Sequence, residues 1–212
     1  MSETVAAPSQ PLQFSTPDDG DELARAEVYG LLAALYIAAP EDALYRQLRV
    51  AVTQAPVAGA FLETSWSELV ATARRLPLEA VEAENVALFG GVGKPDIAIN
   101  ASWYIAGALN ERPLVLLRDE LARLGLERPP TVLETEDHLA ALLEVMRYLI
   151  AGDDVAVCHL ASQQRFFNTH LRPWTEAFCD AVSAHPQADF YRALAGFTRD
   201  FLAVETEGFD LT

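Results

Sequence analysis

Cysteine is scarce in this sequence. The chain has 212 residues and two cysteines, Cys158 and Cys179, and neither belongs to a CxxC pair. A small secreted scaffold held together by disulfides is therefore excluded, and two free thiols are typical of a reducing compartment. The first basic residue is Arg25, and no apolar segment before it has the pattern of a secretory signal. We expect a cytoplasmic protein.

Basic residues are also few. The sequence has 15 lysines and arginines against 31 aspartates and glutamates, which gives a formal net charge of −16. Nucleic-acid binding needs clustered lysine and arginine, so nucleic acid is not an expected partner. No run of about 18 apolar residues occurs, which argues against stable insertion into a membrane. An acidic surface of this kind attracts a basic partner instead.

Strand patterns are missing as well. Alternating β-branched residues and hairpin dipeptides such as Asn-Gly do not occur, whereas apolar residues recur at helical spacing. We predict an all-α bundle of about nine to ten helices that forms one domain over residues 21–212. Residues 1–20 are rich in proline, serine and threonine and predict a disordered tail. A loop at 90–101 and the Pro129-Pro130 break indicate an N-terminal and a C-terminal helical half.

Local signals place the helix ends. Ser65 and Glu68 form a capping box, which predicts a helix that starts at Ser65. Gly125 is expected to take the left-handed conformation that ends a helix. The expected helices lie at about 21–39, 44–52, 65–76, 78–89, 103–109, 114–124, 137–151 and 155–170, and two more follow Pro173 and Pro186.

An acidic group with a histidine, Glu134, Glu136, Asp137 and His138, stands at the expected start of helix 137–151. Carboxylates in the first turn are stabilised by the positive end of a helix, by roughly 0.3–1 kcal/mol each. This explains the acids without any function, but it explains His138 less well, because a cation is disfavoured there. The alternative is binding, in which Asp137 and Glu134 pair with an arginine of a partner and a neutral His138 donates or accepts a hydrogen bond.

Metal and catalytic chemistry find less support. Asp137, His138, Cys158, His159 and His170 are metal-ligand types, but HExxH, CxxC and His-x3–5-His spacings are absent. Nothing near Asp137 and His138 suggests a nucleophile, an oxyanion hole or a phosphate loop. We therefore expect no metal, no cofactor and no catalytic residue.

Apolar and aromatic pairs complete the pattern. Leu88 and Phe89 end a predicted helix at the edge of the 90–101 loop, where such a pair either lines a groove or closes the core. Trp174 and Phe178 are four residues apart on one helix face, which is typical of core packing.

In their order and spacing, these segments resemble the TorD/DmsD/NarJ family of redox-enzyme maturation chaperones, closest to its TorD and DmsD branches. The resemblance covers about residues 26–201. Each piece is short, and their order together is more specific than any one of them. The pieces are Glu84, Leu88-Phe89-Gly90-Gly91, Ser102-Trp103-Tyr104, Glu134-Thr135-Glu136-Asp137-His138-Leu139, His170-Leu171-Arg172-Pro173-Trp174, His185-Pro186 and Phe190-Tyr191-Arg192-Ala193-Leu194.

The resemblance implies an all-helical cytoplasmic chaperone. Members of the family bind the twin-arginine leader, and often the body, of an apo molybdenum enzyme. They hold this enzyme for insertion of the molybdopterin cofactor and delay its export until it is folded. The implied partner is thus the catalytic subunit of an apo molybdopterin oxidoreductase with its leader. The implied leader-binding residues are Leu88, Phe89, Tyr104, Glu134, Asp137 and His138.

Two departures from the family pattern affect this site. Thr135 replaces the proline of the family's Glu-Pro-x-Asp-His motif, so the turn before Asp137 is expected to be less rigid. Ile99-Asn100-Ala101 stand where many relatives carry Pro-Pro-Trp, so that wall of the groove lacks its aromatic side chain. Two other hypotheses stay open: an acidic helical adaptor with an unrelated client, and an enzyme that uses Asp137 and His138.

Overall fold

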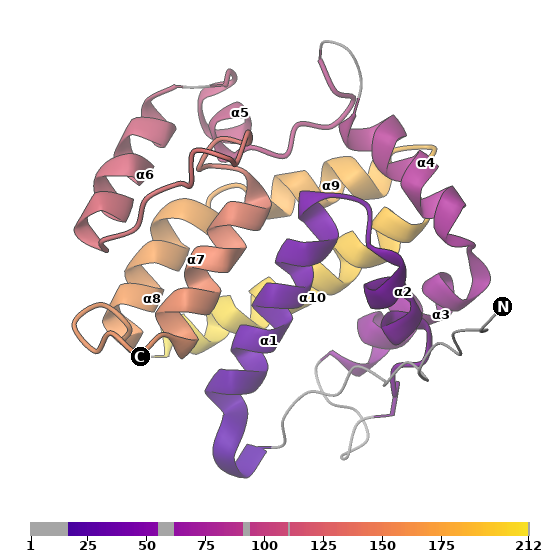
Figure 1. The fold of residues 1–212 in the computed structure, drawn as a ribbon, viewed down its shortest axis with the longest axis horizontal. Helices are drawn as coiled ribbons and strands as arrows, with labels where there is room; N and C mark the ends of the chain where they lie inside the picture. The colour runs from indigo at the N-terminus through magenta and orange to yellow at the C-terminus, as the bar shows by residue number, and fades with distance from the viewer. Residues whose placement is uncertain (1–16, 55–61, 91–93, 110, 212) are drawn as a thin grey trace, which may run out of the picture.

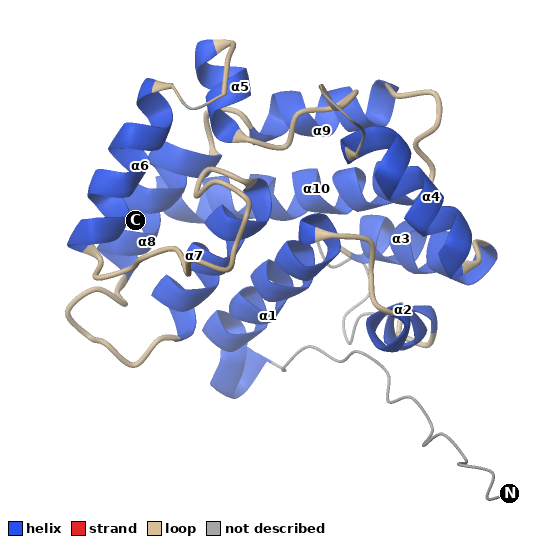
Figure 2. Ribbon diagram, turned by 45° about the horizontal axis from the view of Figure 1, so that its top comes forward, coloured by secondary structure: helices blue, strands red, loops and turns tan. Residues whose placement is uncertain are grey.

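The chain folds into a bundle of helices (Figures 1 and 2). The computed structural model describes residues 17–54, 62–90, 94–109 and 111–211, where one antiparallel bridge, between Asn100 and His138, is the sole β-type pairing. None of the described helices is both long enough and apolar enough to cross a membrane. The described elements are α1 (Pro17–Ile37), α2 (Asp42–Arg49), α3 (Glu63–Arg75), α4 (Leu78–Phe89), α5 (Ala101–Ala106), α6 (Arg112–Arg123), α7 (Leu139–Ala151), α8 (Leu160–Phe166), the π-helix η1 (Phe167–Leu171), α9 (Thr175–Ala184) and α10 (Phe190–Asp210).

Helices α1 and α7 pack along each other in opposite directions near the centre of the bundle. Ile37 at the end of α1 lies near His138 just before α7, and Gly30 lies against Arg147 farther along the pair. Helix α10 crosses behind α1 in Figure 1 and packs on α9 and α3. The prediction of an all-α bundle with nine to ten helices is confirmed, and helices from the two predicted halves share one hydrophobic core.

Aromatic side chains fill much of this core. Tyr36 of α1 meets Phe178 of α9 edge to face, with 5.4 Å between the ring centres. Trp174 and Phe178 are both buried, with their rings 6.0 Å apart, so the prediction that this pair packs in the core is confirmed. Large buried rings of this kind contribute heavily to stability through the apolar area that they remove from water.

A buried carboxylate fastens α4 to the start of α10. Glu84 accepts hydrogen bonds from the backbone N–H groups of Asp189, Phe190 and Tyr191 at 2.8, 2.9 and 2.8 Å. The first N–H groups of a helix have no partner within the helix, and a carboxylate satisfies them and complements the helix dipole. Glu84 thus caps α10 from a segment about a hundred residues away in the sequence.

Several predicted helix ends agree with the structure. Helix α4 has the predicted bounds, Leu78–Phe89, and Gly125 follows α6 with a φ of 70°. The capping-box prediction is wrong, because α3 begins at Glu63 and the Ser65 hydroxyl donates within the helix to the carbonyl of Leu62, at 3.5 Å.

The start of the predicted helix over 155–170 is also wrong, whereas its end near His170 agrees with the structure. Helix α8 begins at Leu160, because the His159 side chain accepts a hydrogen bond from the backbone N–H of Ser162 and so caps the helix there. The backbone then continues as the π-helix η1 rather than as an α-helix. At the other end of the chain, α1 begins at Pro17, with non-helical dihedral angles at Gly20, and residues 1–16 of the predicted tail lie outside the described residues.

Candidate functional site

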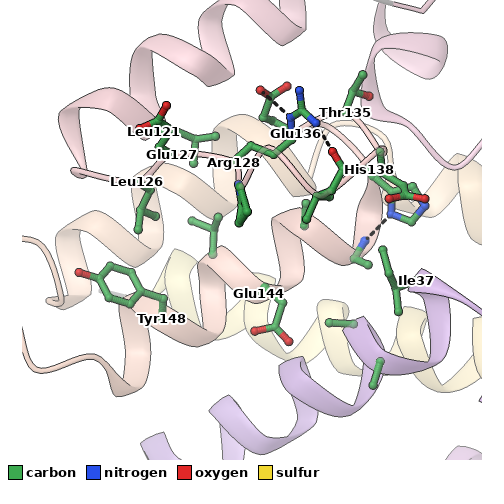
Figure 3. Close-up of a pocket in the computed structure, with 18 residues that line it drawn as sticks. Ile37, Leu121, Leu126, Glu127, Arg128, Thr135, Glu136, His138, Glu144 and Tyr148 are labelled. Atoms are coloured by element: carbon green, nitrogen blue, oxygen red, sulfur yellow. Dashed lines mark hydrogen bonds and ion pairs between the residues drawn. The ribbon is translucent and has the colours of Figure 1, made fainter. Parts of the chain in front are cut away.

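A cavity of about 520 Å³ lies between α1, α7 and the segment that links α6 to α7 (Figure 3). We call it the α1–α7 cavity. Leu121 and Leu126 line it across from Ile37. Short side chains on the two helices leave room for another element to approach their backbones closely. These small lining residues are Ala33 and Ala34 from α1 and Ala140 and Ala141 from α7.

A second cavity of about 510 Å³ adjoins the first, and we call it the loop cavity because the segment from Lys94 to Asn100 forms much of its wall. It is also lined by Phe89 and Trp103. The Lys94 ammonium lies 4.2 Å from the centre of the Trp103 ring, a cation–π distance. The loop cavity therefore combines aromatic surface with a positive charge.

The two cavities share three lining residues, Ile37, Glu134 and His138. Ile37 is exposed on the last turn of α1, and Glu134 is exposed before α7, while His138 is buried between the cavities. The cavities are thus two parts of one groove, and the acid–histidine group found in the sequence lies at their junction.

His138 is the N-terminal cap of α7. Its Nδ1 accepts a hydrogen bond from the backbone N–H of Ala140 at 3.2 Å, which requires that this nitrogen carries no proton. Burial lowers the pKa of His138, against the opposing effects of Glu134 and Asp137. A neutral imidazole avoids placing a positive charge at the positive end of the helix, where a cation is disfavoured.

Asp137 lies before α7 rather than in its first turn, so the helix-dipole explanation of this carboxylate is wrong. Its side chain is 1% exposed, and it accepts hydrogen bonds from the Ser102 backbone N–H at 3.0 Å and from the Ser102 hydroxyl. Burial would raise the pKa of this carboxyl, but the hydrogen bonds from Ser102, Thr135 and Asn100 hold it below its usual value. Asp137 therefore fixes the start of α5, and its oxygens are not available to an arginine of a partner.

Both departures from the family pattern meet at this carboxylate. Thr135 donates to Asp137 Oδ1 at 2.5 Å, and the Asn100 amide donates to Thr135 Oγ1 at 3.0 Å and to Asp137 Oδ1 at 3.3 Å. A proline at position 135 would have no hydroxyl for either bond. The replacement of proline by threonine and the asparagine in the opposite loop thus complement each other, and these bonds tie the two segments together.

The acids around the α1–α7 cavity differ in their partners. Glu136 pairs with Arg118 at 2.9 Å and with Arg128 at 3.3 Å, and Figure 3 shows Glu136 beside Arg128. Glu144 pairs with Arg147 on the surface of α7. Among the described residues, no side chain forms an ion pair with Glu134. Glu134 is the carboxylate at the junction that remains free for a basic partner.

The three apolar and aromatic residues expected at the site take different positions. Leu88 is fully buried, so its side chain closes the core. Phe89 lines the loop cavity and packs edge-on against Tyr191, with the ring centres 5.0 Å apart. Tyr104 stacks on Trp174 and donates its hydroxyl proton to the carbonyl of Ala98 at 2.9 Å, which holds the wall of the loop cavity in place.

Several cavity residues were not predicted from the sequence. The alanines of α1 and α7 carried no signal, because alanine is common in any helix. Ile37 and Lys94 stand outside the motifs, and the exposure of Ile37 at the end of α1 is a property that only the structure shows. In the described part of the chain, no three histidine, cysteine, aspartate or glutamate side chains gather in a way that would hold a metal ion.

Comparison with known proteins assigns the chain to a family. Residues 58–180 match the model of the nitrate reductase delta subunit family, which includes the NarJ and TorD proteins. The chain belongs to this family. The matched region contains both Glu84 and the Glu134–His138 segment, so the resemblance noted from the motifs is confirmed.

Two relatives of known sequence match parts of the chain. An uncharacterised protein of Haemophilus influenzae is 36% identical over 85 residues, which are 40% of this chain and 44% of that protein. The chaperone protein TorD of Aliivibrio fischeri is 26% identical over 127 residues, which are 56% of this chain and 59% of TorD. The chain thus matches about half of the length of these relatives.

A solved structure has the same fold. The crystal structure of a proposed redox enzyme maturation protein from Archaeoglobus fulgidus superposes with a TM-score of 0.54 at 16% identity. The match covers 89% of this chain and 98% of the other chain. The likeness extends over almost the whole bundle, which confirms a TorD-like helical fold.

Proposed function

We propose that this protein is a cytoplasmic maturation chaperone that binds the twin-arginine leader and the cofactor-free catalytic subunit of a molybdopterin oxidoreductase before export. In this proposal it assists cofactor insertion and is not an enzyme. The observation that carries the proposal is the groove formed by two adjoining cavities whose junction holds Glu134 and His138, in a chain of this family.

The shape of the groove favours a helical peptide as the ligand. Each cavity has a volume of about 500 Å³ or slightly more, within the range of about 300–1,000 Å³ that is usual for ligand sites. The alanines of α1 and α7 allow a third helix to lie over the pair, and an apolar helix face in an apolar groove is a common mode of peptide recognition. The apolar segment of an export leader fits this description.

The charge of the chain favours a basic ligand. Its formal net charge of −16 attracts cations over distance, and Glu134 offers an exposed carboxylate at the junction. A bidentate pair between a carboxylate and an arginine is a strong, directional contact. In a leader that carries two arginines before an apolar helix, the arginines therefore match the acidic charge, and the apolar helix matches the apolar lining of the groove.

The contacts of Asp137 and His138 favour binding over catalysis. The carboxylate of Asp137 is occupied by Ser102, Thr135 and Asn100, and Nδ1 of His138 is occupied by the backbone of α7. A general base needs a free acceptor within reach of a substrate proton. These two side chains hold the starts of α5 and α7, which form part of the groove, and have no acceptor free for a reaction.

Isothermal titration with a synthetic twin-arginine leader peptide tests the proposal. We expect Glu134→Arg to weaken binding at least tenfold through charge reversal, and Ala141→Trp to weaken it similarly by filling the α1–α7 cavity. The matched controls are Glu82→Arg and Ala83→Trp, two exposed positions on α4 that line neither cavity. Both controls should bind the peptide as the wild type does.

A leader with both arginines replaced by glutamine separates this proposal from the adaptor hypothesis. The wild type should bind that peptide less tightly than the native leader. If the two peptides bind equally well, or if neither binds, the twin-arginine leader is not the ligand and an acidic adaptor with another client becomes the better hypothesis.

A further inference from the structure

Lys94 and Glu134 carry opposite charges and line the same cavity, the loop cavity. The Lys94 ammonium lies over the ring of Trp103, and in the part of the chain that the structure describes it forms no ion pair with a carboxylate. Both charged side chains are exposed, and they do not pair with each other. The loop cavity thus presents one positive and one negative charge to a ligand.

The α1–α7 cavity differs from the loop cavity in its charge. It is lined by four glutamates and one arginine, whereas the loop cavity is lined by one glutamate and one lysine. The arginine, Arg128, already pairs with Glu136 at 3.3 Å and donates to the carbonyl of Val132. Its donors are therefore engaged within the protein, and Lys94 supplies the positive charge of the groove that a ligand can bind.

The positions of the two cavities give a direction to a bound leader. In the proposed function the arginine pair lies beside Glu134 at the junction, and the apolar helix that follows the arginines lies in the α1–α7 cavity. The residues that precede the arginines then enter the loop cavity on the other side of the junction.

The size of the loop cavity limits how many of these residues it can hold. A sphere with its volume of about 510 Å³ is about 10 Å across, which is the length of about three extended residues. Because Lys94 and Glu134 both line this cavity, a group that binds Lys94 lies within about three residues of a group that binds Glu134. The ligand of Lys94 is thus close to the arginine pair along the leader.

We propose that the loop cavity is a subsite for an acidic residue of the leader, one to three residues before the arginine pair, and that Lys94 determines this specificity by binding its carboxylate. The inference rests on the proposed function, which supplies the leader and its arginines. The contact with Trp103 keeps the ammonium at this wall without neutralising it. Elsewhere in so acidic a groove a carboxylate is repelled, so Lys94 fixes the place of the acidic residue.

Isothermal titration with four synthetic leader peptides tests the inference. Three of them carry aspartate, asparagine or lysine two residues before the first arginine and are otherwise identical. The fourth carries asparagine there and an aspartate two residues after the second arginine. Each peptide is titrated into the wild type, Lys94→Glu and the matched control Arg49→Glu, which makes the same change in net charge at an exposed position on α2 that lines neither cavity. Circular dichroism spectra establish that the variants fold.

We expect the wild type to bind the aspartate peptide about threefold more tightly than the asparagine peptide, and the lysine peptide least tightly, because an exposed ion pair contributes modestly to affinity. Lys94→Glu should reverse this order, and Arg49→Glu should keep it. Raising the salt concentration to about 0.5 M should reduce the preference, since salt screens exposed charges.

Equal affinities of the wild type for the first three peptides overturn the inference and leave the proposed function standing, because the leader is still bound. A preference that survives in Lys94→Glu, or that Arg49→Glu removes equally, also overturns it. A Lys94-dependent preference for the fourth peptide over the asparagine peptide overturns the stated direction of the leader. If the wild type binds none of the peptides, the proposed function fails, and the subsite fails with it.

Discussion

Glu84 and Asp137 are buried carboxylates that each accept hydrogen bonds at the start of another helix. Their other contacts differ: Glu84 lies in the core, and Asp137 lies at the candidate site. Glu84 takes three backbone N–H groups at the start of α10 and lies in the core. Asp137 takes one backbone N–H at the start of α5, and its other hydrogen bonds come from the side chains of Ser102, Thr135 and Asn100. The first arrangement holds a long helix in place, whereas the second ties the start of α5 to the segment before α7, beside the junction of the two cavities.

The comparison teaches how to interpret a buried acid in such a bundle. Backbone N–H groups are available in any sequence, so Glu84 needs only the right position on α4. Asp137 needs particular side chains in two separate segments, Asn100 to Ser102 and Thr135, and Asn100 and Thr135 each line one of the two cavities. A change at Glu84 should therefore alter the stability of the bundle, and a change at Asp137 should alter both stability and binding.

The largest expected effect is that of Glu84→Ala. The substitution leaves three helix N–H groups without an acceptor, and we expect a loss of about 3–5 kcal/mol in the free energy of unfolding. Urea unfolding followed by circular dichroism measures it. Glu82→Ala, at an exposed position on the same helix, should change stability by less than about 0.5 kcal/mol. A similarly small effect for Glu84→Ala would mean that water or another group accepts the hydrogen bonds of the N–H groups at the start of α10.

The next effect is that of Asp137→Ala, which breaks the network at the site. We expect a loss of about 2–3 kcal/mol in stability, together with at least tenfold weaker binding of the leader peptide, because the wall of the loop cavity is no longer fixed. Thermal unfolding and isothermal titration measure the two quantities. Asp119→Ala, at an exposed position on α6, is the control. If leader affinity survives in Asp137→Ala, the contrast with Glu84 disappears.

A smaller, pH-dependent effect concerns His138. Its pKa is lower in the folded protein than its ordinary value of about 6.5, so the folded state binds a proton less readily than the unfolded state. The stability that neutral His138 contributes is present above about pH 6.5 and is lost as the pH falls through the lowered pKa. His138→Asn keeps a capping side chain without a titrating group.

We therefore expect His138→Asn to match the wild type at pH 7.5 within about 0.5 kcal/mol and to be the more stable of the two at pH 5. Urea unfolding at the two pH values checks this, and His170 is common to both proteins, so its titration cancels. An equal pH dependence of the two proteins would show that the cap does not depend on the neutral imidazole.

The smallest effect is the coupling between Asn100 and Thr135. These side chains hydrogen-bond each other and share Asp137, so a double-mutant cycle with Asn100→Ala and Thr135→Val should give a coupling of about 0.5–1 kcal/mol. Urea unfolding of the two single variants and the double variant supplies the values. Simple additivity would mean that the two departures from the family pattern are independent.

The sequence by itself determined the helical class and many helix ends. Periodic apolar residues predicted the bundle, and α4 and the left-handed Gly125 lie where local signals placed them. Such signals suffice because the backbone hydrogen bonds of a helix join residues four apart. The wrong prediction at Ser65 also came from a local signal. A capping motif can occur inside a helix, and a local pattern cannot distinguish the two positions.

Only the tertiary structure decided how the candidate site is made. The motif containing Asp137 and His138 could be found in the sequence, but the burial of Asp137 depends on Ser102, 35 residues earlier. The alanines of the α1–α7 cavity come from two helices that meet only when the bundle is packed. A cavity is a property of side chains brought together over long separations, and no local pattern in the sequence records it.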